Sequence, residues 1–466
     1  MQIKKFLFLT VLFIFSHSIF AQQNIKNVII LIPDGTSADI ITLSRWYQNN
    51  QALAVDEIIC GLVKTHSVEN KITDSAPSST AYATGEKTKS GYIGVDSSKA
   101  PLWSVLELSK LKGMSTGIVA TCQFPHATPA DFVCHYFDRE AYDTLSHQFI
   151  NNSPDVVFTG GYRNILESKL EFRLKDTSKF TFISNYNSFK SLGSLAFRDK
   201  PVWGLFNNWQ NSNKYLSFDC DRDTTKEPSL SEMAQKAIEI LSKNPKGFFL
   251  MVEGSQIDWA AHSNDPKAAV TDFIAFDKAV GVCLKYAKSN KNTVVIVCPD
   301  HGNGGISIGN TNSNSFYDEL KIKDKIIAPL KTAQHSASWV VENLFKNIDS
   351  TQETIPAVIA IISFIKKEYY ISLYKDEAEN IFNTLIFAKN NSLKKDSCLS
   401  EIRYFLTGKL SWESYVGWTT HGHTGEDVFL GMYHPYNDRL TGVIDNTDVA
   451  KYIARQLGLG ILPRRK

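Results

Sequence analysis

Runs of consecutive apolar residues recur along the chain and set its framework. They are NVIILIPDG (27–35), STGIVATCQFPHATP (115–129), DVVFTGG (155–161), GFFLMVEGS (247–255) and NTVVIVCPDHG (292–302). Apolar runs without polar alternation are typical of strands buried on both faces of a parallel sheet. Because helical segments alternate with these runs, the pattern predicts a three-layer α/β/α fold with a largely parallel central sheet.

Two of the helical segments are clearly marked. SEMAQKAIEILSKN (231–244) opens with Ser231 and Glu232 and stops before a proline. DPKAAVTDFIAFDKAVGVCLKYAKSN (265–290) has Pro266 in its first turn, where the N–H that proline lacks would have no helical acceptor. Strand and helix therefore alternate as a doubly wound sheet requires.

Acidic residues stand where three of the apolar runs stop. Asp34 follows the first run, Glu253 ends the run at 247–255, and Asp300 and His301 follow the run at 292–302. Ligands of doubly wound sheets bind beyond the carboxyl ends of the strands. Each short acidic sequence alone would be an ordinary turn. Together they indicate a ligand site at one edge of the sheet.

A second group of candidate ligands follows Glu253. Asp258 and His262 are spaced i, i+4, so on a helix they share one face and can offer ligands to one zinc ion. A helix N-terminal acid beside a hydrogen-bonded histidine has the same spacing and is the alternative. His421 and His423, in a glycine-rich loop, are candidates for a third ligand.

Such ligands suit phosphoryl transfer. Two zinc ions about 4 Å apart, bridged by a carboxylate, can stabilise both the attacking and the leaving oxygen of an in-line displacement. Magnesium prefers an oxygen-only corner, which Asp34, Glu253 and a hydroxyl group could form.

The stretch NKITDSAPSSTAYATGEKTKSGYIGVD (70–96) places Ser75 directly after Asp74, at the expected start of a helix. A serine hydroxyl needs a base or a metal before it can attack. Zinc would activate it, and a helix N-terminus would add positive potential beneath a phosphate. Taken alone, Ser75 could equally be a helix cap.

Six motifs occur in the order seen in bacterial alkaline phosphatases. They are VIILIPDGTS, TDSAPSSTAYATGEKTKSGYIGV, HATPADFVCHYFDR, MVEGSQIDWAAH, CPDHG and HGHTG. The chain resembles that family from about residue 26 to about residue 435, and the combination of motifs is highly specific.

The resemblance implies a broad hydrolase of small phosphomonoesters that works through a phosphoserine. Ser75 matches the nucleophile, Arg139 matches the arginine that grips two phosphate oxygens, and Asp74 would hold that arginine. The resemblance also implies two zinc ions and one magnesium ion. The matching residues are Asp258, His262 and His423 for one zinc, Asp34, Asp300 and His301 for the other, and Asp34, Thr128 and Glu253 for magnesium.

Two positions depart from the enterobacterial pattern of the family. His126 stands where that pattern has an aspartate near the magnesium, and Trp259 stands where it has a lysine that reaches phosphate through water. Imidazole suits zinc better than magnesium, so the third ion could be zinc or another divalent cation. His421 does not fall on the family's ligand histidine and is expected to support the site from outside.

The long segment 302–422 separates His301 from His423. Family members carry variable insertions here, often a lid or crown over the active site or the dimer interface. We expect such an insertion at about 325–415, and the resemblance implies a homodimer.

Residues 1–21 have the features of a cleaved secretory signal, with Lys4 and Lys5 before the apolar run FLFLTVLFIF. This predicts an exported protein, periplasmic or secreted, with residues 22–466 as the catalytic part and no membrane anchor after signal removal. The net charge of +2 gives no sign of a nucleic-acid-binding surface. Seven cysteines leave at least one thiol without a partner in the chain.

Three other functions can be weighed against the main hypothesis. A phosphodiesterase of the same scaffold typically has threonine where Ser75 stands, and a sulfatase needs a CxPxR motif that this sequence lacks. A non-catalytic phosphate- or metal-binding exported protein should have lost the nucleophile or a ligand. No matching position is missing here, so the sequence favours the phosphomonoesterase.

Overall fold

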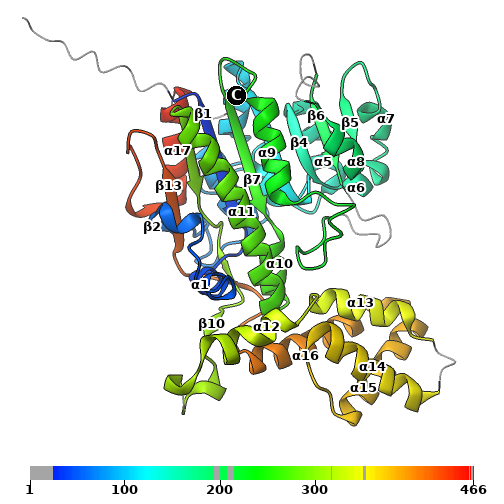
Figure 1. Ribbon diagram of the computed structural model, residues 1–466. Coiled ribbons are helices and arrows are strands. Elements are labelled where there is room, and N and C mark those ends of the chain that lie inside the picture. Colours follow the sequence, from blue (N-terminus) through cyan, green and yellow to red (C-terminus); the bar gives the residue numbers. More distant parts are fainter. Residues whose placement is uncertain are drawn as a thin grey trace, which may run out of the picture.

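The computed structural model describes residues 25–193, 200–206, 215–315, 317–349 and 353–460, together with Leu462 and Arg465. Its centre is a ten-stranded sheet in the order β14-β2-β13-β8-β1-β7-β3-β4-β6-β5 (Figure 1). The strands are β1 (Asn27–Pro33), β2 (Ile59–Lys64), β3 (Ser115–Gln123), β4 (Val156–Gly160), β5 (Thr181–Ile183), β6 (Val202–Leu205), β7 (Phe248–Gly254), β8 (Thr293–Val297), β13 (Val428–Tyr433) and β14 (Gly442–Asp445).

Neighbouring strands of this sheet run parallel except at β13. That strand pairs antiparallel with both β2 and β8. The five apolar runs of the sequence form the central strands β8, β1, β7, β3 and β4. The prediction of a largely parallel sheet is therefore confirmed.

The residues of β1 show why its sequence is apolar throughout. Ile29 and Leu31 belong to one buried hydrophobic cluster, and Val28, Ile30 and Ile32 belong to another. Successive side chains of a strand point to opposite faces, so each face of β1 packs against a separate layer. Every residue of the strand is buried.

Helices cover both faces and complete the predicted three-layer fold. One layer contains α1 (Ala38–Tyr47), α9 (Leu230–Leu241) and α11 (Pro266–Asn290), whose buried residues join the cluster of Ile29. The other contains α2 (Ser75–Thr84), α3 (Val105–Leu111), α5 (Tyr142–Asn152) and α17 (Asn446–Leu457), whose buried residues join the cluster of Val28.

The helix starts differ slightly from the sequence prediction. α9 begins at Leu230, because Ser229 is the N-cap and forms a capping box with Glu232. α11 begins at Pro266, as predicted, with the Asp265 carboxylate accepting hydrogen bonds from the first free backbone N–H groups.

A separate group of helices lies between β10 (Ser307–Ile308) and β11 (Val416–Gly417), two short strands that pair with each other. Figure 1 shows this group beyond the end of the sheet where β7 runs into α10 (Gln256–His262). Its helices are α12 (Ala328–Thr332), α13 (Ala337–Asn347), α14 (Thr354–Tyr369), α15 (Lys375–Asn390) and α16 (Lys395–Glu413). They occupy the stretch for which the sequence predicts an insertion.

The predicted signal segment 1–21 lies outside the described residues. Within the described part of the chain, no helix combines the length and apolar character needed to cross a membrane. All seven cysteines are described, and each is a free thiol.

Candidate active site

The carboxyl ends of the central strands bring the predicted acidic residues together. β1 and β7 are in register, with Ile32 opposite Glu253, so Asp34 follows just beyond the level of that carboxylate. Gly35 then turns the chain with a φ of +63°, and a Cβ there would lie 2.5 Å from Asp258 Oδ1. Glycine thus allows the turn after β1 to pass close to Asp258.

Asp34, Asp300 and His301 form the first potential metal-binding cluster. Their ligand atoms lie within 4.8 Å of one another, and all three side chains are fully buried. His301 Nε2 is 3.3 Å from Asp300 Oδ2 and 3.6 Å from Asp34 Oδ1. The structure therefore brings together the three residues expected at one zinc site.

Asp258, His262 and His423 form the second cluster, also with ligand atoms within 4.8 Å of one another. His262 Nε2 lies 3.4 Å from Asp258 Oδ2 and 3.1 Å from His423 Nε2. Asp258 and His262 belong to α10, whereas His423 follows the helical group in the sequence. Pairing of β12 (His423–Thr424) with β9 (Gly302–Asn303) brings it there, beside His301.

The backbone determines which imidazole nitrogens face the clusters. Nδ1 of His262 lies 2.6 Å from the His421 carbonyl oxygen, and Nδ1 of His423 lies 2.9 Å from the Thr73 carbonyl oxygen. Nδ1 of His301 likewise faces the Gly302 carbonyl oxygen at 3.2 Å. Carbonyls only accept hydrogen bonds, so Nδ1 is the protonated nitrogen in each ring. Nε2 of each ring thus faces the clusters and offers its lone pair there when the imidazole is neutral, as metal-binding histidines require.

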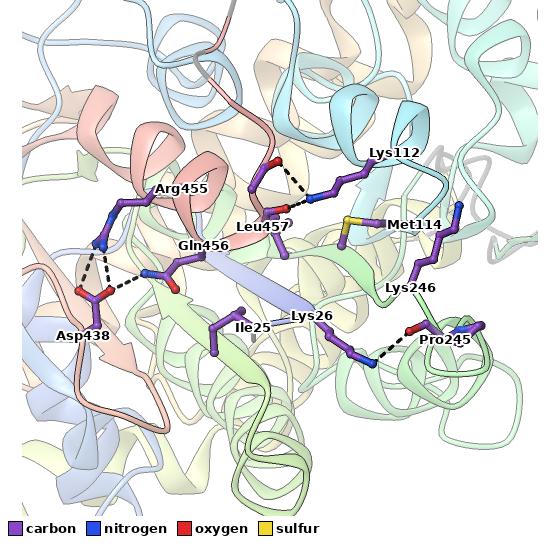
Figure 2. Close-up of a pocket in the computed structure, with 11 residues that line it drawn as sticks. Ile25, Lys26, Lys112, Met114, Pro245, Lys246, Asp438, Arg455, Gln456 and Leu457 are labelled. Carbon is purple, nitrogen blue, oxygen red and sulfur yellow. Dashed lines mark hydrogen bonds and ion pairs between the residues drawn. The ribbon is translucent and has the colours of Figure 1, made fainter. Parts of the chain in front are cut away.

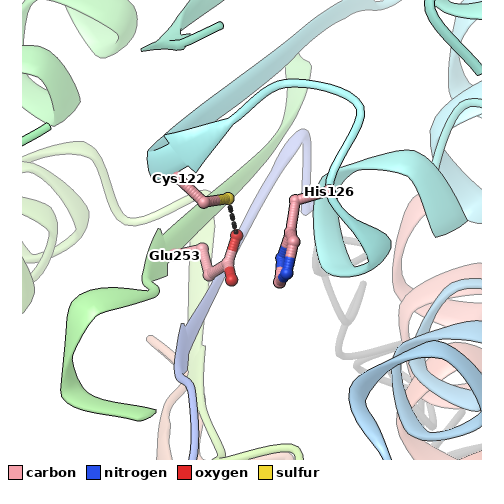
Figure 3. A group of neighbouring side chains, drawn as sticks. All are labelled: Cys122, His126 and Glu253. Atoms are coloured by element: carbon pink, nitrogen blue, oxygen red, sulfur yellow. Dashed lines mark hydrogen bonds between the residues drawn. The ribbon is translucent and has the colours of Figure 1, made fainter. Parts of the chain in front are cut away.

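Cys122, His126 and Glu253 form a third cluster (Figure 3). Cys122 Sγ donates a hydrogen bond to Glu253 Oε2 at 3.3 Å. His126 is the N-cap of α4 (Ala127–Asp131), and Thr128 lies in the first turn of this helix. Glu253 and Thr128 are the residues expected to hold magnesium, whereas the thiol was not anticipated as a possible ligand.

Burial of so many ionisable groups is electrostatically unfavourable without cations. Burial, and then repulsion by Asp300, raises the pKa of Asp34 well above its usual range. Burial also raises the pKa of Glu253 to about 8. Burial lowers the pKa of His126 to about 3, with Arg139 acting in the same direction, and lowers that of His423 to about 4. These histidines are neutral at neutral pH, as metal ligands must be.

The pKa of Asp258 is lowered, in contrast to those of Asp34 and Glu253. Burial acts to raise the pKa of its carboxyl, but the hydrogen bond and charge of His262 lower that pKa overall. Burial opposes protonation of His262, yet its contact with Asp258 raises the pKa of the imidazole. This pair is therefore the one part of the three clusters that partly balances its own charge.

Several buried polar atoms at the site have no hydrogen-bond partner among the described residues. They are Asp34 Oδ1 and Oδ2, Asp300 Oδ2, Glu253 Oε1, Thr128 Oγ1 and His126 Nδ1. Buried polar groups are normally paired, because leaving one unpaired costs about 1–3 kcal/mol. Unpaired oxygen and imidazole nitrogen atoms gathered at one place can serve as ligands of divalent cations, so these residues are suited to hold such ions.

Asp74, rather than Ser75, caps helix α2. Asp74 Oδ1 accepts a hydrogen bond from the Ala76 backbone N–H at 2.9 Å and lies 3.3 Å from Arg139 Nη1. Ser75 is buried, and its Oγ lies 3.2 Å from His301 Nε2, beside the first cluster. The helix-cap alternative for Ser75 is therefore excluded, and its hydroxyl is free for another role.

Sequence comparison agrees with this arrangement. The family model for alkaline phosphatase matches residues 25–459. The chain belongs to the alkaline phosphatase family. It is 32% identical over 456 residues to alkaline phosphatase 3 of Bacillus subtilis, with 94% of this chain and 90% of that protein covered.

Solved structures of the family have the same architecture. A cold-active alkaline phosphatase from the psychrophile Shewanella sp. is 28% identical, with a TM-score of 0.76, covering 94% of this chain and 100% of that one. A variant of TAB5 alkaline phosphatase with Mg bound in its M3 site shares the fold at 22% identity and a TM-score of 0.63, covering 93% of this chain and 98% of that one.

The two positions that depart from the enterobacterial pattern lie next to each other in this family member. The His126 and Trp259 rings meet edge to face at 5.7 Å between centroids, and Arg139 Nη2 lies 3.2 Å from His126 Nε2. His421 does not join a cluster. Its backbone oxygen accepts from His262, and its own Nδ1 lies 3.1 Å from the His262 carbonyl oxygen. It supports His262, as expected.

Beyond Trp259 lies a cavity of about 180 Å³. Trp259, Tyr215 and Trp339 line it, with Glu342 and Arg403 from the helical group. The Tyr215 and Trp259 rings are 4.4 Å apart. Trp259 therefore contacts both this aromatic cavity and His126 of the site.

A larger cavity, of about 630 Å³, lies at the opposite end of the sheet, near the start of β1 and the end of α17 (Figure 2). Its polar groups are mostly paired with the protein itself. Arg455 binds Asp438, Lys112 donates to the Leu457 carbonyl oxygen, and Lys26 donates to the Pro245 carbonyl oxygen. Size alone therefore does not identify the active site.

Proposed function

We propose that this enzyme hydrolyses phosphomonoesters through a phosphoserine at Ser75. The observation that carries the proposal is the position of the Ser75 hydroxyl. It lies beside Asp34, Asp300 and His301, while Asp74 performs the capping that Ser75 could otherwise have done. A hydroxyl at a helix N-terminus beside potential cation ligands is suited to attack phosphorus.

Arg139 supports the choice of a monoester. Its guanidinium is held by Asp74 and also contacts His126, and its side chain remains 21% exposed. A guanidinium can donate two parallel hydrogen bonds to the free oxygens of a terminal phosphate. With the phosphate held in this way, Ser75 Oγ attacks phosphorus, the alcohol leaves, and water then hydrolyses the phosphoserine to regenerate Ser75.

Two zinc ions and one further divalent cation complete the proposal. Asp258, His262 and His423 would hold one zinc, Asp34, Asp300 and His301 the other, and Asp34, Thr128 and Glu253 the third ion. The orphaned oxygens and the inward-facing Nε2 atoms support this assignment. Cations here supply positive charge that favours ionisation of the Ser75 hydroxyl and stabilises the leaving oxygen.

Hydrolysis of p-nitrophenyl phosphate and of bis-p-nitrophenyl phosphate tests the proposal. The assay is made at alkaline pH with zinc and magnesium, before and after chelation. We expect a strong preference for the monoester that chelation abolishes and restored cations recover. A preference for the diester would favour a phosphodiesterase of the same superfamily. No hydrolysis of either, with phosphate still bound, would favour the non-catalytic binding protein.

We propose that the aromatic cavity beside Trp259 receives planar leaving groups. Tyr215, Trp259 and Trp339 offer ring surface, and among the residues that the structure describes none is a hydrogen-bond partner of the buried Arg403 Nε. Aryl and nucleoside phosphates could place their rings there while the phosphate reaches Arg139. The phosphate would still dominate recognition, which is consistent with a broad substrate range.

The proposed organisation of the chain follows the sequence prediction. Residues 1–21 would be removed on export to the periplasm or medium, and 22–466 would form the catalytic part with an insertion at about 325–415. Mass spectrometry of the mature N-terminus would test the cleavage. A homodimer stays a prediction that analytical ultracentrifugation can check.

A further inference from the structure

The third cluster contains a thiol, a type of ligand that is absent from the set expected to hold magnesium. Ligand atoms of Cys122, His126 and Glu253 lie within 4.8 Å of one another. Figure 3 shows the Cys122 thiol above the Glu253 carboxylate and the His126 ring beside that carboxylate. Cys122 is fully buried, His126 is 7% exposed and Glu253 is fully buried.

The backbone holds Cys122 in this place. It lies near the end of β3, which pairs with β7 so that Ala120 is opposite Glu253. Ser255 Oγ accepts a hydrogen bond from the Cys122 N–H at 3.1 Å, and the Ser255 N–H donates to Thr121 Oγ1 at 3.0 Å. These two hydrogen bonds, between the end of β3 and the residue after β7, hold the thiol next to the carboxylate.

Two atoms of the cluster point to a ligand that is not a protein group. His126 Nδ1 and Glu253 Oε1 are buried, and neither has a hydrogen-bond partner within the described part of the chain. A sulfur, a nitrogen and an oxygen donor converging in this way match the ligands of zinc, whereas magnesium prefers oxygen alone.

We propose that Cys122 is a ligand of the third cation, so that this corner binds a thiophilic divalent cation such as zinc in preference to magnesium. The inference deepens the proposed function, on which it rests. On binding, the Sγ–H bond breaks and its electron pair forms the bond to the cation. The proton leaves to solvent by way of Glu253 Oε2, which already accepts the thiol hydrogen bond.

Binding at His126 also affects Arg139. A guanidinium only donates, so at 3.2 Å from Arg139 Nη2 the lone pair of the neutral imidazole lies on Nε2. Neutral imidazole has a single lone pair, and a cation bound by either nitrogen takes it. The contact from Arg139 is then lost, and its Nη2 becomes available to a phosphate oxygen. The third cation and phosphate should therefore each strengthen binding of the other.

Cobalt substitution tests the sulfur ligand directly. Apo protein is loaded with Co²⁺, and the near-ultraviolet thiolate-to-cobalt charge-transfer band is measured in the native chain, Cys122→Ser and Cys134→Ser. Cys134 is a matched control, since it is fully buried and its thiol faces the Leu145 carbonyl oxygen, outside all three clusters. We expect the band in the native chain and Cys134→Ser and its loss in Cys122→Ser. A missing band in the native chain, or an unchanged band in Cys122→Ser, would overturn the proposal.

A second measurement needs no variant. X-ray absorption of the native zinc-loaded protein, with magnesium in excess, should show a sulfur neighbour at about 2.3 Å from zinc. A spectrum with only nitrogen and oxygen neighbours would contradict the role of Cys122. Hydrolysis of p-nitrophenyl phosphate is followed in parallel. Hydrolysis without the cobalt band would count against the sulfur ligand alone, and the band without hydrolysis would count against the proposed function alone.

Discussion

Ser75 Oγ lies 3.2 Å from His301 Nε2, although the two residues are far apart in the sequence and belong to different elements. Ser75 is the first residue of α2, and His301 follows β8. Nε2 is the His301 nitrogen that faces the serine, because Nδ1 faces the Gly302 carbonyl oxygen. The serine hydroxyl is therefore placed at a cluster of cation ligands, where activation of the nucleophile is chemically possible.

Replacing Ser75 by alanine should lower turnover of p-nitrophenyl phosphate by roughly a thousandfold or more, since the nucleophile is lost. Zinc content should stay nearly unchanged, because none of the three clusters contains Ser75. Ser79→Ala is the matched control. Ser79 lies in the same helix and is buried, and its Oγ has no hydrogen-bond partner among the described residues. Loss of zinc in Ser75→Ala would mean that Ser75 is structural.

Arg139→Lys should raise the KM for monoesters by about tenfold or more while the fold is retained, because lysine cannot form the two-pronged contact with phosphate. Hydrolysis of a diester should change much less. Arg455→Lys, at the distant cavity where Arg455 pairs with Asp438, is a matched control. Equal losses for monoester and diester would remove the assigned role of Arg139 in selecting a terminal phosphate.

The cation-free protein should lose stability as the pH rises from 6.5 to 8. The pKa of Glu253 is raised by burial from 4.5 to about 8, so the folded chain holds a proton that the unfolded chain releases. This contribution is fully present below pH 4.5 and is lost as the pH rises through 8. The lowered pKa of His423 acts in the opposite direction, but only between pH 6.5 and about 4.

Differential scanning calorimetry of chelated and zinc-loaded protein at pH 6.5, 7.2 and 8 measures this effect. Each proton bound only in the folded state changes the free energy of unfolding by up to about 1.4 kcal/mol per pH unit. Zinc should therefore raise the melting temperature more at pH 8 than at pH 6.5. A chelated protein equally stable across this range would show that Glu253 is not a buried acid in solution.

Tyr215→Leu should lower kcat/KM for aryl and nucleoside phosphates by about tenfold relative to glycerol phosphate, because a ring contact contributes about 0.5–1.5 kcal/mol beyond the area it buries. Tyr436→Leu, an exposed position that does not line the cavity, is the control. An equal change for aromatic and aliphatic esters would show that leaving groups do not use the cavity.

Local sequence was sufficient to predict the central strands and the acids at their ends. A run such as NVIILIP can be buried on both faces only within a covered sheet, and its stop at Asp34 marks the strand end. The sequence predicts the start of α9 at Ser231, one residue after the observed first residue Leu230, because several serines and acids near residue 230 can serve as the cap. Ser229 is the N-cap in the folded chain, because its side chain and that of Glu232 form a capping box.

The sequence by itself determined the layered fold, and its motifs identified the family and the residue types of the site. These depend on patterns within single elements or on short sequence motifs, and neither requires the distances between elements. The tertiary structure decided how the residues meet. Pairing of β9 with β12 places His423 beside His301, although the helical group separates them in the sequence. Backbone carbonyl oxygens orient the imidazole rings of His262 and His423.

Tertiary structure also decided two assignments that residue spacing left open or missed. Asp74 caps α2 and frees Ser75, and strand pairing places the Cys122 thiol against Glu253. Both are contacts whose geometry depends on how separate elements pack. Hydrophobic periodicity specifies which face of an element is buried, but the distance between two side chains depends on the packing of the whole sheet and its helices.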